Sequence, residues 1–311
     1  MIKLSKISKT YDNGVEALSN ISFEIKSGRV AYILGESGSG KSTLLKIIAG
    51  LEDANGGHIK VDGEEITGPS HHLVPGYDHL AYVPQDFKLQ QFWTVGDNIG
   101  KKISHYSFEE KNARIEELLE LCKLEDYKDR YPRELSGGQQ QRIAMAAAVA
   151  DEPNVVLLDE PFSNLDLPMK AEVRKEIIGM LRTLGITVLL VSHDPAEALA
   201  VADQILILNQ GKIEQQGQPI TVYQNPKSLY AAKFLGPINE LKIGKKKLLI
   251  RPEKITISTI GKYEAKVEDC IFMGMHFHTL LNISDQSELA LCYSINPHKK
   301  GDTVCFDVDL K

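Results

Sequence analysis

The sequence predicts an α/β fold that is followed by a small domain of antiparallel strands. Three short, continuously apolar runs are typical of strands that a mainly parallel sheet buries on both faces. They are Val30–Leu34, Val155–Leu158 and Thr187–Val191. Helical spacing follows the first run over Ser42–Ala49 and recurs between the other two over Met169–Leu184, and a glycine follows each of these helices. Strands and helices that alternate along the chain indicate an α/β protein.

The segments around these elements have different patterns. Near the beginning, Ile2–Ser8 and Ile21–Ile25 alternate between apolar and polar residues, and the turn signal Asp12–Gly14 separates them. This pattern predicts an antiparallel β subdomain. From about residue 87 to residue 135, a capping box at Ser107–Glu110 opens a stretch in which apolar residues keep helical spacing. We expect a helical insertion there rather than a further strand–helix unit.

Helical periods disappear after about Gly236. Short alternating runs take their place and predict a small antiparallel β-barrel. We therefore expect two domains, one of residues 1–236 with a helical subdomain at about 87–135, and one of residues 237–311. The alternating runs are Leu248–Ile250, Ile255–Ile257, Ala265–Ile271, Phe277–Leu281, Leu289–Cys292 and Val304–Val308.

Composition and charge narrow the class of protein. The 311 residues are 42% hydrophobic and 25% charged, as is usual for globular proteins. A net charge of −6 argues against a nucleic-acid-binding surface, which needs a basic face. The chain has no apolar run long enough to span a bilayer, and its first residues lack the features of a signal peptide. The 4 cysteines form no CxxC pattern, so we expect reduced, buried thiols in a cytosolic protein.

A glycine-rich loop stands where the first buried strand meets its helix. Backbone N–H groups of such a loop converge on phosphate oxygens, and the N-terminus of the helix adds partial positive charge. Lys41 would reach the β- and γ-phosphates of a nucleotide, and Ser42 would ligate Mg²⁺. The loop consists of Gly35, Glu36, Ser37, Gly38, Ser39, Gly40, Lys41, Ser42 and Thr43.

Polar residues directly follow the other predicted strands. Asp159 and Glu160 come after Val155–Leu158, and the carboxyl ends of parallel strands are where such sheets bind ligands. The Asp159 carboxylate suits a magnesium shell, and Glu160 is the natural base for an attacking water molecule. His193, just past the third buried strand, suits a sensor of the γ-phosphate. Gln85, at the end of another short strand, is placed to contact the metal or the attacking water.

The octapeptide LSGGQQQR at Leu135–Arg142 predicts an anion-binding helix start. Ser136 and Gln139 fit a capping box. Gly137 and Gly138 weaken the first turn of a helix, but they allow backbone amides to approach an anion closely. In a simple packing, this helix start cannot reach a phosphate that its own chain's loop holds. We therefore expect a second copy of the chain to supply it.

Taken together, these motifs resemble the ATP-binding cassette (ABC) family over about residues 1–236. The resemblance implies a P-loop NTPase cassette that binds ATP and Mg²⁺ and hydrolyses ATP at the interface of a homodimer, where both sites are competent. It identifies Gly35–Thr43 as the Walker A loop, Gln85 as the Q-loop glutamine, Leu135–Gln139 as the signature, Val155–Glu160 as the Walker B strand with its catalytic glutamate, Ser163–Asp166 as the D-loop, and His193 as the switch histidine. Tyr11 matches the aromatic residue that stacks on adenine, and Asp166 is the last residue of the D-loop.

The tail narrows the resemblance further. Gly217–Pro226, Phe234–Gly236 and Ile250–Glu253 are similar to segments of ATPases that serve importers of sugars, polyamines, ferric iron or oxyanions. In these ATPases a small barrel of the OB/TOBE type follows the cassette. The resemblance implies a peripheral protein on the cytoplasmic face of the plasma (inner) membrane. Its partners would be permease subunits and, indirectly, an extracytoplasmic solute-binding protein, but no nucleic acid. A soluble ABC ATPase in a non-transport role and an exporter ATPase are the alternative functions.

Overall fold

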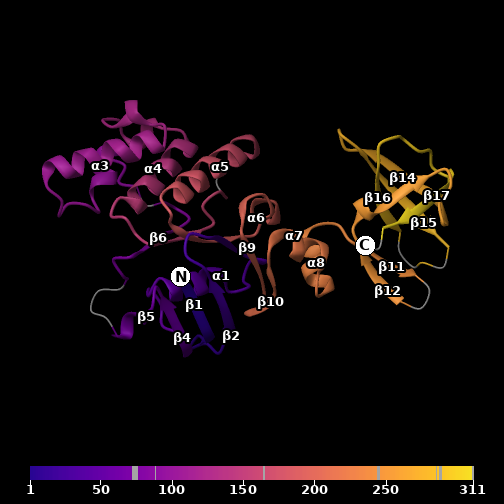
Figure 1. The fold of residues 1–311 in the computed structure, drawn as a ribbon, viewed down its shortest axis with the longest axis horizontal. Helices are drawn as coiled ribbons and strands as arrows, with labels where there is room; N and C mark the ends of the chain where they lie inside the picture. The colour runs from indigo at the N-terminus through magenta and orange to yellow at the C-terminus, as the bar shows by residue number, and fades with distance from the viewer. Residues whose placement is uncertain are drawn as a thin grey trace. The chain divides into compact units, whose positions relative to one another are not determined.

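The computed structural model describes residues 1–71, 76–87, 89–163, 165–243, 246–284, 286 and 289–309. The chain divides into two compact units, Met1–Val222 and Tyr223–Lys311 (Figure 1). The short helix α7 (Pro219–Gln224) contains the division. The predicted domain boundary after residue 236 stays a prediction.

A six-stranded sheet forms the centre of the first unit. Its strand order is β10-β9-β3-β8-β7-β6, and every pairing is parallel except that of β10 with β9. Every residue of β3, β7 and β8 is buried, as their continuous apolar runs predict. The strands are β3 (Val30–Leu34), β6 (Leu80–Val83), β7 (Val155–Asp159), β8 (Thr187–Ser192), β9 (Gln204–Asn209) and β10 (Lys212–Gly217).

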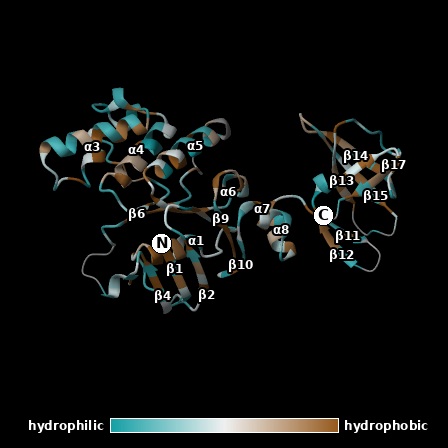
Figure 2. Ribbon diagram, viewed as in Figure 1, coloured by the Kyte–Doolittle hydropathy of each residue, from teal (hydrophilic) through white to brown (hydrophobic). Residues whose placement is uncertain are grey.

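A second, antiparallel sheet packs with this centre through helix α1 (Lys41–Ile48). Its strand order is β2-β1-β4-β5, and apolar residues of both sheets and of α1 share one hydrophobic core. Figure 2 shows hydrophobic and hydrophilic residues alternating on the strands, and more hydrophilic residues on the outer helix α3. The antiparallel β subdomain that the alternating runs predict is therefore present. Its strands are β1 (Ile2–Thr10), β2 (Glu16–Ile25), β4 (Gly56–Val61) and β5 (Glu64–Ile66).

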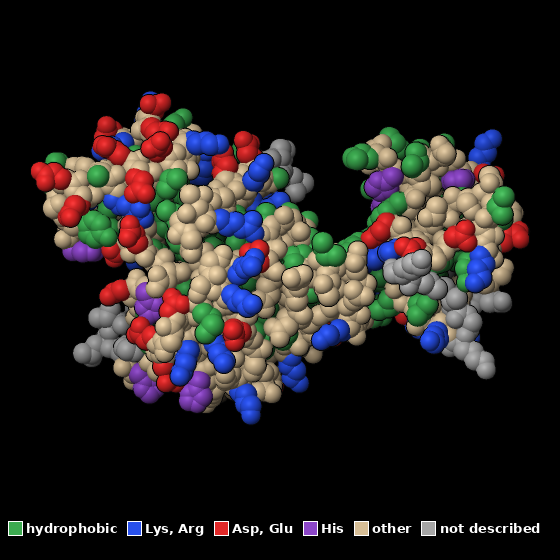
Figure 3. Space-filling model, viewed as in Figure 1, with side chains coloured by type: hydrophobic (Ala, Val, Ile, Leu, Met, Phe, Trp, Pro, Cys, Tyr) green, Lys and Arg blue, Asp and Glu red, His purple; other side chains and the backbone are tan. Residues whose placement is uncertain are grey.

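Helices form the other side of the first unit (Figure 1). The predicted capping box opens α3, because the Ser107 hydroxyl accepts a hydrogen bond from the Glu110 N–H and the Glu110 carboxylate accepts one from the Ser107 N–H. Figure 3 shows acidic side chains gathered over α3, on its solvent-facing side. The helices are α2 (Val95–Gly100), α3 (Phe108–Leu121), α4 (Gly137–Val149), α5 (Leu167–Thr183) and α6 (Pro195–Val201), with short 3-10 turns at Pro69–His71, Glu125–Tyr127 and Pro132–Glu134. None of the helices among the described residues is both long and apolar enough to cross a membrane.

The second unit is mainly a five-stranded antiparallel sheet of order β13-β17-β14-β15-β16. Inward side chains such as Val267, Leu281 and Phe306 form its core. Each of the predicted alternating runs lies in a strand, except that Leu289 precedes β16, so the predicted barrel-like domain is confirmed. The elements are α8 (Leu229–Leu235), β11 (Asn239–Ile243), β12 (Lys246–Ile250), a 3-10 turn (Pro252–Lys254), β13 (Ile255–Ser258), β14 (Tyr263–Phe272), β15 (Phe277–Ile283), β16 (Ala290–Ser294) and β17 (Thr303–Val308).

A buried arginine joins α8 to the strands within this second unit. Arg251 is only 4% exposed, and its Nη1 donates to the carbonyl oxygens of Ala232, Gly236 and Pro237 at 2.9–3.0 Å. Its Nε and Nη2 both donate to the carbonyl oxygen of Tyr223, and its guanidinium lies 4.1 Å from the centre of the Tyr223 ring. The end of α8 is thereby fixed to the start of the 3-10 turn.

Candidate nucleotide site

The glycine-rich loop connects β3 to α1 and is closely packed. A Cβ atom on Gly35 would lie 2.4 Å from the carbonyl oxygen of Leu208 on β9, so no larger residue fits there. Lys41 is 5% exposed, and its Nζ donates to the carbonyl oxygens of Gly35 and Glu36 at 2.9 and 2.8 Å. Burial lowers the pKa of Lys41, while the carboxylates of Glu160 and Asp159 act in the opposite direction. The loop thus holds a cation where a phosphate group would need one.

The carboxylate of Asp159 faces the first residues of α1. Ser42 Oγ donates to Asp159 Oδ1 at 2.9 Å, and the hydroxyl of Tyr82 on β6 donates to Asp159 Oδ2 at 3.1 Å. Burial raises the pKa of Tyr82, and the Asp159 carboxylate raises it further, so the phenol stays protonated. A hydroxyl and a carboxylate oxygen side by side fit Mg²⁺, which commonly uses one or two protein oxygens together with phosphates of the substrate.

Glu160 and His193 meet at the ends of neighbouring strands β7 and β8. His193 Nδ1 donates to Glu160 Oε2 at 2.9 Å, and both side chains are partly open to solvent. Glu160 has a φ of 45°, which is a left-handed conformation that costs a residue with a side chain about 1–3 kcal/mol. Its N–H donates to the carbonyl oxygen of Val191, which fixes this turn to β8. The strained turn therefore brings two consecutive carboxylates, Asp159 and Glu160, to one site.

Gln85 reaches this turn through Ser163. Its Nε2 donates to Ser163 Oγ at 3.1 Å, and the Ser163 hydroxyl donates to the carbonyl oxygen of Glu160 at 2.9 Å. Gln85 thus contacts the segment after Glu160, and its hydrogen bonds in the described part of the chain do not include Ser42 or Asp159.

The D-loop follows this segment. Asp166 is exposed and is the N-cap of α5. Asn164, which the sequence places in the D-loop, lies outside the described residues.

Tyr11 lies beside the last residue of the glycine-rich loop. Its hydroxyl shares a hydrogen bond of 2.9 Å with Thr43 Oγ1, and Lys9 Nζ lies 5.2 Å from the centre of its ring. The ring remains partly exposed at the end of β1. An exposed aromatic ring that is fixed next to a phosphate loop can stack on a nucleotide base.

The signature octapeptide forms the start of α4, as predicted. The Ser136 N–H donates to Gln139 Oε1 at 2.9 Å, and the Gln139 N–H donates to Ser136 Oγ at 3.3 Å, so the capping box is confirmed. Gly138 also has a packing role, because a Cβ there would lie 3.1–3.2 Å from side-chain atoms of Val173 and Met169 on α5. Gly137 is less crowded, with Leu165 at 3.8 Å. Its amide is the more accessible one for an anion.

Sequence reasoning missed the contacts of three residues that support the site. Ser163 carries the contact of Gln85, and Tyr82 carries that of Asp159. Gln141 is fully buried in α4, and its Nε2 donates to the carbonyl oxygen of Pro161 at 2.5 Å, so the signature helix contacts the residue after Glu160. A polar ring in the otherwise apolar strand Leu80–Val83 was the available signal for Tyr82. A glutamine on the inward face of an amphipathic helix was the signal for Gln141.

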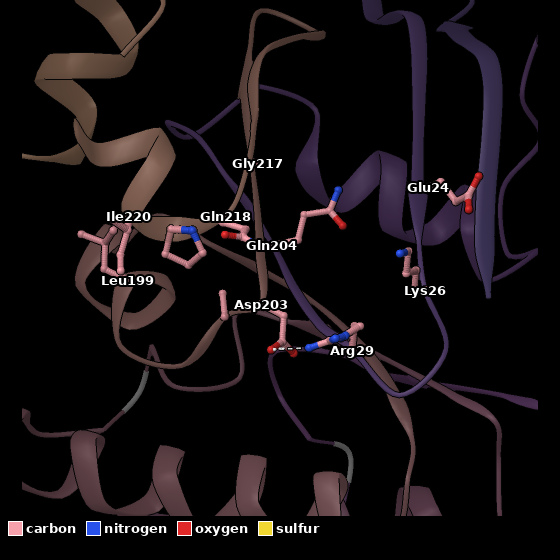
Figure 4. Close-up of a pocket in the computed structure, with 11 residues that line it drawn as sticks. Glu24, Lys26, Arg29, Leu199, Asp203, Gln204, Gly217, Gln218 and Ile220 are labelled. Atoms are coloured by element: carbon pink, nitrogen blue, oxygen red, sulfur yellow. Dashed lines mark hydrogen bonds and ion pairs between the residues drawn. The ribbon is translucent and has the colours of Figure 1, made fainter. Parts of the chain in front are cut away.

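A groove of about 680 Å³ lies elsewhere on the first unit (Figure 4). Arg29 and Asp203, which form an ion pair at 3.3 Å in this groove, precede the first residues of the parallel strands β3 and β9. The groove therefore lies at the amino ends of the parallel strands, opposite to the glycine-rich loop. None of the predicted site residues lines it.

Fold and site together define a P-loop ATPase cassette followed by a small β domain. The family model described as "ABC transporter" matches residues 18–163, and the model described as "TOBE domain" matches residues 248–310. The sulfate/thiosulfate import ATP-binding protein CysA of Pseudomonas syringae pv. tomato is 38% identical over 321 residues, which cover 98% of this chain and 97% of the relative. The spermidine/putrescine import ATP-binding protein PotA of Bacillus cereus is 37% identical over 301 residues, which cover 94% of this chain and 90% of the relative.

Solved structures agree with these relatives. A dimeric, post-hydrolysis structure of the ATP-binding cassette MJ0796 bound to ADP and Pi has a TM-score of 0.61 at 31% identity, covering 70% of this chain and 99% of that one. The structure of cbiO1 from Clostridium perfringens has a TM-score of 0.67 at 28% identity, covering 75% of this chain and 92% of that one. The chain belongs to the ABC transporter family, among the import ATP-binding proteins that carry a C-terminal TOBE domain. It is an ATPase, and both the predicted family and the predicted fold class are confirmed.

Proposed function

We propose that two copies of this import ATPase face each other head to tail, so that each ATP lies between Lys41 of one copy and Ser136 of the other. The start of α4 supports this arrangement. Its capping box satisfies Ser136 and Gln139, whereas the first-turn amides at Gly137 and Gly138 point along the helix axis toward an incoming anion. Those amides suit the γ-phosphate of an ATP molecule that a second copy holds. The similar solved structure, the cassette MJ0796 bound to ADP and Pi, is itself a dimer.

Within each site, the residues at the strand ends divide the chemistry. Lys41 neutralises the β- and γ-phosphates, and the loop Gly35–Thr43 supplies backbone amides. Ser42, Asp159 and Gln85 would hold Mg²⁺, which would supply positive charge against the phosphate oxygens. Glu160 accepts the proton of the attacking water.

The remaining residues align this chemistry. His193 keeps the Glu160 carboxylate in place through the 2.9 Å hydrogen bond and faces the γ-phosphate. Tyr11 stacks on the adenine ring. Gly138, Gln139 and Asp166 complete the site from the facing copy, which makes each site dependent on both chains.

A groove beside the Q-loop strand suits the permease partner. It has a volume of about 1010 Å³ and runs along Tyr77–Tyr82, with Lys102 and His105 after α2 on one side and Leu51 after α1 on another. A groove of that size accepts a short helix of a partner. Since this strand leads to Gln85, a change at the nucleotide site would be transmitted through Gln85 to a docked permease segment. We infer that the protein works at the cytoplasmic face of the plasma membrane, with an extracytoplasmic solute-binding protein as an indirect partner.

In the proposed system, the permease contacts the transported solute and this ATPase does not. The relatives that import sulfate or thiosulfate and those that import spermidine or putrescine are about equally similar to this chain. Polyamines, oxyanions, ferric iron and sugars therefore all stay among the proposed solutes.

The experiment that tests the proposed function replaces Glu160 with Gln. Without a carboxylate that accepts a proton, ATP turnover should fall by about 10²–10⁴-fold while ATP binding persists. The variant should also accumulate as an ATP-bound dimer, which sedimentation with and without ATP measures. Glu172→Gln, the same change at an exposed position of α5, is the matched control and should leave both properties unchanged. Near-normal turnover in Glu160→Gln, or a monomer that retains ATP, would contradict the proposal.

A further inference from the structure

Tyr82 is a polar residue in a strand that otherwise serves the core. Its neighbours Ala81 and Val83 are buried, whereas Tyr82 is half-buried. β6 pairs with β7 in parallel, and Tyr82 is in register with Leu157, two residues before Asp159. A tyrosine side chain is long enough to cover that offset. Its hydroxyl therefore reaches the end of the adjacent strand, where the carboxylate of Asp159 lies.

Both oxygens of the Asp159 carboxylate are held by this chain. Ser42 Oγ donates to Oδ1 at 2.9 Å from the side of α1, and Tyr82 donates to Oδ2 at 3.1 Å from the side of β6. Asp159 is 8% exposed, so water competes weakly for these positions. Two donors on opposite oxygens fix the rotation of the carboxylate about its terminal bond.

We propose that Tyr82 is a positioning residue of the nucleotide site: its hydroxyl orients the Asp159 carboxylate so that Asp159 and Ser42 present their oxygens together to Mg²⁺. This inference rests on the proposed function, because it assigns the metal to Ser42 and Asp159. Partners that orient a metal ligand typically change metal affinity about 10–100-fold when they are removed. Tyr82 is only half-buried, so we expect an effect near the lower end of that range.

The competing explanation is that the hydroxyl only satisfies a hydrogen bond near the core. Another tyrosine of the same sheet separates the two explanations. Tyr32 on β3 is fully buried, and its hydroxyl has no hydrogen-bond partner among the described residues. Tyr32→Phe therefore removes a hydroxyl from this sheet without changing a contact of Asp159.

The experiment compares full-length wild type, Tyr82→Phe and Tyr32→Phe in binding of a fluorescent ATP analogue. Each protein is titrated with the analogue in EDTA and then at increasing Mg²⁺ concentrations. Tyr82→Phe should bind the analogue in EDTA as the wild type does. It should need about 10-fold more Mg²⁺ to reach half of the metal-dependent increase in affinity. Tyr32→Phe should match the wild type in both measurements.

Three results would overturn the inference in distinguishable ways. An unchanged Mg²⁺ midpoint in Tyr82→Phe would show that the hydroxyl does not orient the metal ligand, and the proposed function would stand. A parallel loss of affinity in EDTA would make Tyr82 a structural residue of the loop. A wild type whose affinity does not respond to Mg²⁺ would remove the metal site itself, and the role of Tyr82 with it.

Discussion

Each unit of the molecule buries a cation against backbone carbonyl groups, but the two cations are held differently. Lys41 in the first unit donates to two carbonyl oxygens of its own loop. Arg251 in the second unit donates to four different carbonyl oxygens and stacks on an aromatic ring. An ammonium group is a compact charge that can exchange its partners, whereas a guanidinium group with its donors engaged holds a fixed geometry. The first cation is available for a ligand, and the second holds the fold together.

The same contrast extends to the neighbouring polar groups. In the first unit, polar side chains at the carboxyl ends of parallel strands bond to other side chains. Asp159 accepts from Ser42 and Tyr82, and Glu160 accepts from His193. In the second unit, the buried Asn239 donates to the carbonyl oxygen of Leu291 and accepts from its N–H. The Asn239 side chain therefore joins β11 to β16, whereas the side-chain pairs of the first unit lie together at the candidate site.

The largest expected effect is on ligand binding in the first unit. Lys41→Ala removes the cation that we propose for binding the phosphates, so the affinity for ATP should fall by about 100-fold or more. The melting temperature should fall little, because water can replace the ammonium group as the donor to the two carbonyl oxygens. Titration with a fluorescent ATP analogue and thermal unfolding measure the two effects. Lys46→Ala, an exposed lysine of α1, is the control. Unchanged affinity in Lys41→Ala would remove the contrast between the two cations.

An intermediate effect is expected on the stability of the second unit. Arg251→Met leaves several carbonyl oxygens without a donor and should lower the free energy of unfolding by about 3 kcal/mol, while ATP affinity stays unchanged. The only tryptophan of the chain, Trp93, lies in the first unit. Urea unfolding should therefore shift when followed by circular dichroism and shift less when followed by Trp93 fluorescence. Lys266→Met, an exposed lysine of β14, should shift neither. A weakened ATP site in Arg251→Met would contradict the purely structural role.

The effect that is smallest at neutral pH is a pH dependence that the two units share. Burial raises the pKa of Cys122 in the first unit and of Cys292 in the second from 9.0 to about 12. Between these values the unfolded chain loses the thiol proton and the folded chain keeps it. Each thiol should therefore reduce the free energy of unfolding by about 1.4 kcal/mol per pH unit as the pH rises above 9, and should have no effect below it. Urea unfolding of Cys292→Ala at several alkaline pH values should show a shallower loss of the free energy of unfolding with pH than the wild type.

The sequence predicted the buried strands because their apolar runs are continuous. It placed a helix at Met169–Leu184, whereas α5 is Leu167–Thr183, because a proline near its start reads as a boundary although proline is compatible with a first helical turn. It did not predict β9 and β10 or the short helices α7 and α8. In the second unit, it did not predict β11, in which only Leu241 and Ile243 are apolar.

The contacts within the site could be predicted only in part. The types of residue at the strand ends indicated phosphate and metal chemistry, because each followed a recognisable strand or loop. Which side chains touch depends on strand order, which local patterns do not encode. The neighbouring positions of β6, β7 and β8 decide that Asp159 contacts Tyr82 and that Glu160 contacts His193. The roles assigned to these residues, and to Gln85 and Asp166, stay predictions.

The positive φ of Glu160 has a consequence for anyone who alters this protein. Glycine or asparagine would relax the backbone at this position, since both accept a left-handed conformation readily. Either replacement would also delete the acceptor of the imidazole proton of His193. With Glu160 in its proposed role as the base, selection for heat resistance and selection for ATP turnover would favour different residues at position 160.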